Sequence, residues 1–144
     1  MDLHFHHLGM ACRNIAAELP ELAIVGYNPE GPIIEDPIQQ VRIQFVSGGG
    51  PRLELIEPAD AQSPVQGILK RGGKFYHLAY EVGRFDDAIA YFRERQYLPV
   101  SSPAPAVAFD MRRIVFLASA TRTLIELIEA RTGCESAKAR SGAQ

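Results

Sequence analysis

The sequence predicts an α+β fold in which two duplicated βαβββ units form one mixed, curved sheet. The first observation is a repeat: the segment HLGMA at 7–11 is similar to HLAYE at 77–81. The second is that LELIEP at 53–58 is echoed by IELIEA at 125–130. The third is that each half reads as a strand, a helix and then about three strands. Neither half can bury its own sheet, so the two units must pack together.

The first half begins with a short apolar run over 5–12 that suits a buried strand. Asn14 can cap a helix from Ile15 to about Leu22, in which Pro20 limits regularity. The Gly- and Pro-rich stretch 26–37 predicts an irregular connection. The segment 41–46 alternates apolar and polar residues, as a half-buried strand does. After a turn at 48–51, a second strand is expected over 52–57, and Pro58 ends it.

The second half follows a connector over 60–73, in which Ser63 and Pro64 start a short helix through Leu69. Its expected elements are a strand over 75–82, an amphipathic helix over 86–95, a loop over 99–105, a short strand over 106–109, and strands over 112–117 and 124–129. We therefore predict one domain over 1–131, with modules at about 5–58 and 75–130. Residues 132–144 have no apolar period, which predicts a disordered tail.

The composition excludes several classes of function. With 47% hydrophobic and 22% charged residues and a net charge of −2, the chain gives no electrostatic reason to bind nucleic acid or a membrane surface. It has no apolar run of membrane-spanning length, and because its first residues lack the basic and apolar regions of a signal peptide, we expect none. Two cysteines, Cys12 and Cys134, without CxxC spacing predict no structural disulfide and fit a reducing cytoplasm.

The repeats deliver two histidines and two glutamates symmetrically, namely His7, Glu54, His77 and Glu126. Each glutamate lies in the most apolar strand of its half, where a carboxylate is costly unless it is paired, hydrogen-bonded or bound to metal. Taken singly, each residue is more often a satisfied half-core histidine or a solvated glutamate. Because the pairs match, we expect one four-ligand site for a divalent ion: Co, Mn, Ni, Zn or Fe(II).

These motifs resemble the vicinal oxygen chelate (VOC) or glyoxalase superfamily, and most of all its methylmalonyl-CoA epimerases. The likeness covers 5–130 and is carried by the segments 5–11, 52–58, 63–65, 69–73, 76–82 and 124–129. The Ser-Pro and Arg-Gly-Gly connector before the second His strand resembles the epimerases more than glyoxalase I. The resemblance implies a cupped sheet with His7, Glu54, His77 and Glu126 as metal ligands.

The chemistry that the resemblance implies is proton abstraction next to a thioester carbonyl of a short acyl-CoA, with the metal as Lewis acid. Glu126 is the expected catalytic base, since the last ligand in this family can loosen from the metal. The expected substrate is a small molecule, with no nucleic acid or membrane partner, and a homodimer is expected. No residue in a recognisable motif offers a second acid or base, although Glu35, Gln40 and Gln44 are considered for this role. Arg112 and Arg113 could reach an anionic group of the substrate.

Three other functions stay open. A glyoxalase I-like lactoylglutathione lyase would use the same ligands, and Glu54 favours it mildly because some epimerases have Gln there. A non-catalytic small-molecule-binding protein of the same superfamily is disfavoured, since such proteins often lose the ligands. An Fe(II) extradiol dioxygenase is weaker, because such sites use two His and one carboxylate.

Overall fold

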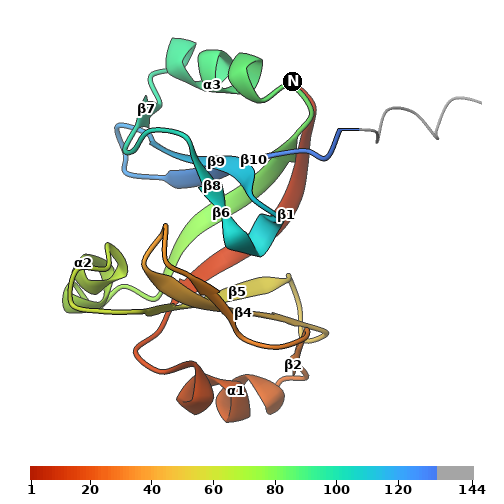
Figure 1. Ribbon diagram of the computed structural model, residues 1–144, viewed down its shortest axis with the longest axis vertical. Helices are drawn as coiled ribbons and strands as arrows, with labels where there is room; N and C mark the ends of the chain where they lie inside the picture. Colours follow the sequence, from red (N-terminus) through yellow and green to blue (C-terminus); the bar gives the residue numbers. More distant parts are fainter. Residues whose placement is uncertain (133–144) are drawn as a thin grey trace, which may run out of the picture.

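The computed structural model describes residues 1–132, and these form one mixed sheet of 10 strands with helices packed against it (Figure 1). Its strand order is β2-β4-β5-β1-β6-β10-β9-β7, with β3 beside β4 and β8 beside β9. This arrangement confirms the predicted α+β fold of two similar halves. The end of the predicted tail, 133–144, lies outside the described residues.

The longer elements of the first half follow the predicted order with small changes at their ends, while the stretch predicted as an irregular connection holds two short strands, β2 and β3. The elements of this half are β1 (Leu3–Ala11), α1 (Ile15–Ala23), β2 (Asn28–Pro29), β3 (Ile34–Asp36), β4 (Val41–Ser47) and β5 (Leu53–Pro58). The side chain of Asn14 accepts a hydrogen bond from Ala17 N and caps α1 as expected. The connector holds the short helix α2 (Val65–Lys70).

The second half repeats this plan. Its elements are β6 (Phe75–Val82), α3 (Phe85–Glu94), β7 (Leu98–Pro99), β8 (Ala104–Ala106), the 3-10 turn η1 (Val107–Phe109), β9 (Arg112–Ala118) and β10 (Leu124–Glu129). The predicted strand over 106–109 is wrong, because the strand ends at Ala106. Asp110 and Met111 follow with φ of 55° and 64°, a left-handed conformation that turns the chain back toward β9.

The two halves join along β1 and β6, which pair antiparallel and cross the middle of the molecule (Figure 1). On their outer sides β1 pairs parallel with β5, and β6 pairs parallel with β10. The first and last long strands of each half therefore lie side by side. This places all four segments that carry the repeated His and Glu in adjacent strands at the centre of the sheet.

Each half packs its own helix against the sheet. Ile15 of α1 lies in an apolar cluster with Met10 and Leu55, while Ala88 and Phe92 of α3 lie in another with strands of the second half. Burying a side chain such as Leu55 contributes about 1.5–3 kcal/mol. A third cluster contains residues of both halves, including Phe45 and Phe109, and surrounds the central site.

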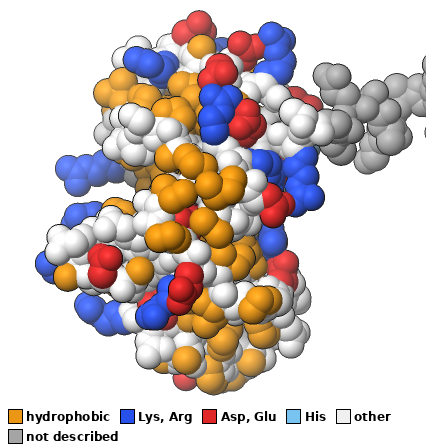
Figure 2. Space-filling view, viewed as in Figure 1, with side chains coloured by type: hydrophobic (Ala, Val, Ile, Leu, Met, Phe, Trp, Pro, Cys, Tyr) orange, Lys and Arg blue, Asp and Glu red, His pale blue; other side chains and the backbone are white. Residues whose placement is uncertain are grey.

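The surface carries interleaved charges of both signs, with apolar side chains gathered over the middle of one face (Figure 2). Within residues 1–132, no helix has the length and apolar character needed to cross a membrane.

Candidate metal centre

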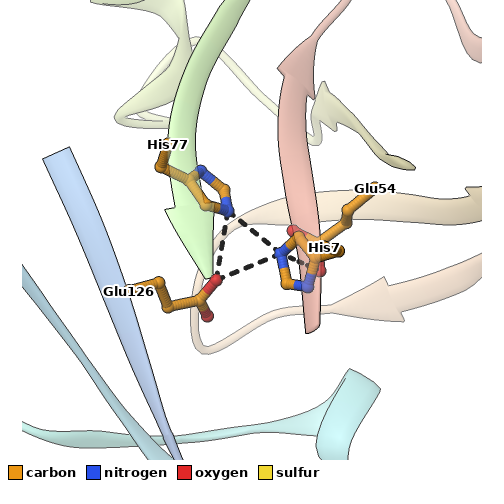
Figure 3. A group of neighbouring side chains, drawn as sticks. All are labelled: His7, Glu54, His77 and Glu126. Atoms are coloured by element: carbon orange, nitrogen blue, oxygen red, sulfur yellow. Dashed lines mark hydrogen bonds and ion pairs between the residues drawn. The ribbon is translucent and has the colours of Figure 1, made fainter. Parts of the chain in front are cut away.

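The structure brings the four residues from the repeated motifs to one point (Figure 3). Nε2 of His7 lies 3.1 Å from Nε2 of His77 and 3.3 Å from Oε2 of Glu126. Oε2 of Glu54 lies 3.5 Å from Nε2 of His7, and Oε2 of Glu126 lies 3.1 Å from Nε2 of His77. Donor atoms of all four residues lie within 4.8 Å of one another, although the residues come from four different strands.

The strand register explains why the imidazole and carboxylate groups of these four residues lie close together. Glu54 on β5 lies opposite Gly9 on β1, and Gly9 lies opposite His77 on β6. In the neighbouring row, Ala79 of β6 lies between His7 of β1 and Glu126 of β10. Directly opposed residues share a face of the sheet, so a small residue between each His and Glu leaves room for the larger heads. The duplicated sequence supplies this small residue two positions after each histidine.

Burial sets the protonation of the group, since all four side chains are excluded from solvent. Burial raises the pKa of Glu54 to about 7, and it lowers the pKa of His77. Burial acts against the charge of Glu126, yet His7 and His77 hold its pKa at about 2. Burial also acts to lower the pKa of His7, but Glu54 and Glu126 raise it above the ordinary value. In the absence of a cation, the cluster therefore contains a buried carboxylate that retains its charge.

The donor set fits a divalent transition metal. Oε2 of Glu54 and Oε2 of Glu126 are buried without a regular hydrogen bond within the described chain, and both point to the shared centre. Ligands at about 2.1 Å from an ion in tetrahedral or octahedral positions lie about 3.0–3.4 Å apart. The distances of 3.1, 3.3 and 3.5 Å among the four heads are close to this spacing. Imidazole with carboxylate suits Zn, Co, Ni, Mn or Fe(II).

A cavity of about 60 Å³ borders the cluster on the side of Glu54 and Glu126. Its wall is mainly apolar and comes from both halves: Val41, Ile43, Ile56, Pro64, Val65, Tyr76, Ala106, Phe109, Ile114 and Phe116, with Asp36 and Gln39 as further polar residues. A small apolar cavity next to two carboxylates suits a short aliphatic group whose reacting carbon must meet a base.

Sequence reasoning missed Asp36, which is buried and lines this cavity. Its Oδ1 accepts hydrogen bonds from Ile38 N and Gln39 N, both at 3.0 Å, and its Oδ2 accepts one from Val107 N at 3.0 Å. Asp36 therefore connects the β3–β4 turn of one half to η1 of the other. The Asp-Pro pair was the available signal, because such pairs open turns in which Asp accepts backbone N–H groups.

The other residues considered from sequence lie outside the cavity. Glu35 is exposed, Gln40 occupies a left-handed turn position, and Gln44 donates to the carbonyl of Gly31 at 3.1 Å. Arg112 pairs with Glu81 at 2.7 Å and Arg113 with Glu129 at 2.8 Å. Both arginines are thus engaged within the protein, in strand β9.

Comparison with known proteins agrees with this architecture. Residues 6–116 match the family described as Glyoxalase/Bleomycin resistance protein/Dioxygenase superfamily. The bovine mitochondrial methylmalonyl-CoA epimerase is 29% identical over 83 residues, which are 56% of this chain and 47% of that protein. The chain thus spans about half the length of this curated relative.

Solved structures superpose over most of the chain. A hypothetical protein from Bacillus halodurans C-125 has a TM-score of 0.79 and 27% identity, over 94% of this chain and 100% of its own. A variant of Streptomyces coelicolor methylmalonyl-CoA epimerase in complex with 2-nitronate-propionyl-CoA has a TM-score of 0.76 and 25% identity, over 94% and 99%. With a family match that covers most of its length, the chain belongs to the glyoxalase/bleomycin resistance protein/dioxygenase superfamily.

Proposed function

We propose that this protein is a metal-dependent epimerase or racemase that removes and returns the proton next to the thioester carbonyl of a short acyl-CoA. The observation that carries the proposal is the convergence of His7, Glu54, His77 and Glu126 beside an apolar cavity. Both carboxylates of this set, Glu54 and Glu126, also line that cavity. The likeness to epimerases that are named for an acyl-CoA substrate supports the choice of thioester.

His7, Glu54, His77 and Glu126 would hold the ion, which would serve as a Lewis acid for the negative charge that develops on the carbonyl oxygen. The small cavity has room for roughly four water-sized groups, which suits a short acyl chain rather than a bulky one. Its mainly apolar wall excludes water, and this protects a carbanion-like species from premature protonation.

Glu126 is the proposed base. It lies at the border between the ligand cluster and the cavity, and the two neighbouring imidazoles keep it ionised despite its burial. Proton transfer by a positioned carboxylate contributes about 10²–10⁴-fold to rate. Asp36 is a further carboxylate of the cavity wall, but three backbone N–H groups occupy its oxygens, which assigns it to structure rather than proton transfer.

The test is solvent exchange. The protein is loaded with Co(II) or Zn(II) and incubated in D2O with methylmalonyl-CoA or propionyl-CoA, and mass spectrometry follows deuterium at the carbon next to the thioester. We expect exchange by the wild type and a loss of about 10²-fold or more in Glu126→Gln. Glu129→Gln is the matched control, because Glu129 lies on the same strand but pairs with Arg113 outside the cavity.

Other outcomes would contradict the proposal and separate it from its alternatives. Absence of exchange by fully loaded protein with either thioester would reject it. Turnover of methylglyoxal with glutathione in place of exchange would favour a lactoylglutathione lyase. Tight calorimetric binding of a small molecule to metal-free protein, without turnover, would favour sequestration.

A further inference from the structure

His6 stands beside the candidate metal ligands because of an irregularity in strand β1. In the β1–β6 ladder, Phe5 pairs with Tyr80 and His7 pairs with Ala79, so one residue of β1 has no counterpart. Such a bulge breaks the alternation by which successive side chains face opposite sides of a sheet. The bulge allows His6 to approach the next residue, His7, and Nδ1 of His6 lies 2.8 Å from Nδ1 of His7.

The ring of His6 is held on several sides. It packs edge-on against Phe109, with centroids 5.4 Å apart, and against Phe45 at 6.3 Å. Nη1 of Arg52 lies 3.3 Å from Nε2 of His6 and 3.5 Å from Nδ1. Arg52 is itself fixed, since its Nε pairs with Glu30 at 2.9 Å and its guanidinium lies over Phe45. These contacts make the His6 ring a rigid partner for His7.

The short distance between the two Nδ1 atoms means that one of them donates a proton and the other accepts it. A hydrogen bond needs one donor and one acceptor, and Nε2 of His7 is the atom directed at the other three candidate ligands. If Nε2 of His7 offers its lone pair to a cation, its Nδ1 carries the proton and donates to Nδ1 of His6. Nη1 of Arg52 lies at similar distances from both ring nitrogens of His6, so its positive charge favours a neutral His6 ring without selecting which nitrogen carries the proton.

We propose that His6 is a positioning residue, which accepts the Nδ1–H of His7 and so directs the Nε2 lone pair of His7 toward the cation. This inference rests on the proposed metal site. A hydrogen-bond acceptor on the nitrogen that does not bind the metal orients a ligating imidazole and fixes its tautomer. The equivalent place in the second half is taken by Tyr76, and Nδ1 of His77 has no partner within the described residues. The two histidine ligands are therefore held differently.

The first experiment measures zinc affinity by competition with a chelator. His6→Phe keeps an aromatic ring against Phe45 and Phe109 but lacks the acceptor, and we expect about 10–100-fold weaker binding. His6→Asn places an acceptor near the position of Nδ1, and we expect it to recover most of the loss. His4→Phe is the matched control, because His4 lies on the same strand with a largely exposed side chain and pairs with Asp2.

The second experiment observes the proton directly in zinc-loaded wild-type protein, the state in which Nε2 of His7 offers its lone pair to the ion. Long-range ¹H–¹⁵N spectra of the histidine rings at about pH 8 should show a proton on Nδ1 of His7 and none on Nδ1 of His6. A proton on Nδ1 of His6, or wild-type zinc affinity in His6→Phe, would overturn the inference. Should the wild type bind no zinc, the proposed metal site fails and this inference fails with it, whereas either result above would overturn the inference alone.

Discussion

Gly9 lies directly opposite His77 across the β1–β6 ladder, and the His77 imidazole fills the space that a side chain on residue 9 would need. A Cβ built on Gly9 overlaps Cε1 and Nδ1 of that ring. The requirement for glycine here is steric, because its backbone is ordinary extended strand and the crowding atoms belong to a candidate ligand. The absence of a side chain at one position thus determines where the ligand on the next strand can lie.

Gly9→Ala should therefore weaken metal binding while leaving the fold in place. The added methyl group displaces the His77 ring, and we expect at least a roughly ten-fold loss of zinc affinity, similar to the loss of a supporting contact. Gly83→Ala is the control, since nothing lies within 4 Å of a Cβ at that position. Chelator competition measures both, and equal affinities would show that the ring is not confined as described.

Asp36→Asn should destabilise the protein by about 1–3 kcal/mol. The amide can still accept from Ile38 N and Gln39 N, but its NH₂ then faces the N–H of Val107, so two donors oppose each other at the contact between the halves. Urea unfolding would report the change as a lower midpoint. Glu35→Gln, one residue earlier and exposed, should leave the midpoint unchanged; an equal shift in both would contradict the proposed role of Asp36.

Zinc affinity should rise with pH between about 6 and 8. The pKa of Glu54 is raised to about 7 and that of His7 is raised as well, so in metal-free protein at pH 6 these groups carry protons that the ion must displace. The pKa of Glu126, at about 2, leaves this group already deprotonated, and the lowered pKa of His77 reduces the share of protons that the ion must displace there. Each displaced proton changes the affinity by up to about ten-fold per pH unit.

Calorimetry in buffers with different ionisation enthalpies would count the protons released on zinc binding. Release that declines from pH 6 to pH 8, together with tighter binding, is the expected result. An affinity that is constant over this range would show that Glu54 and His7 hold no such protons.

The long strands, the two main helices and the convergence of four side chains could be predicted from the sequence, because the duplication places the same motif in both halves. These side chains are His7, Glu54, His77 and Glu126. A single His or Glu on a strand is ambiguous, whereas the same residue at the same place in both halves selects one interpretation. The same comparison separated His7 from His6, since only His7 has a counterpart in His77. The alternation or helical spacing of apolar residues over six or more positions predicted the long strands and helices.

The parts that were missed depend on contacts between distant segments. Strands β2, β3, β7 and β8 contain two or three residues each, too few to show a period. The 3-10 turn at Val107–Phe109 depends on Asp36, 71 residues earlier, which accepts from Val107 N. The role of His6 depends on a register shift between β1 and β6, which neither strand reveals alone.

The central claim is that two imidazoles and two carboxylates hold one cation. Its most direct measurement is the metal content of purified protein after reconstitution and desalting, in the wild type and in His7→Ala, His77→Ala and His4→Ala. The account predicts about one divalent ion per chain in the wild type and in His4→Ala, and little in the other two variants. Wild-type protein that stays free of metal, or equal metal content in all four proteins, would contradict it.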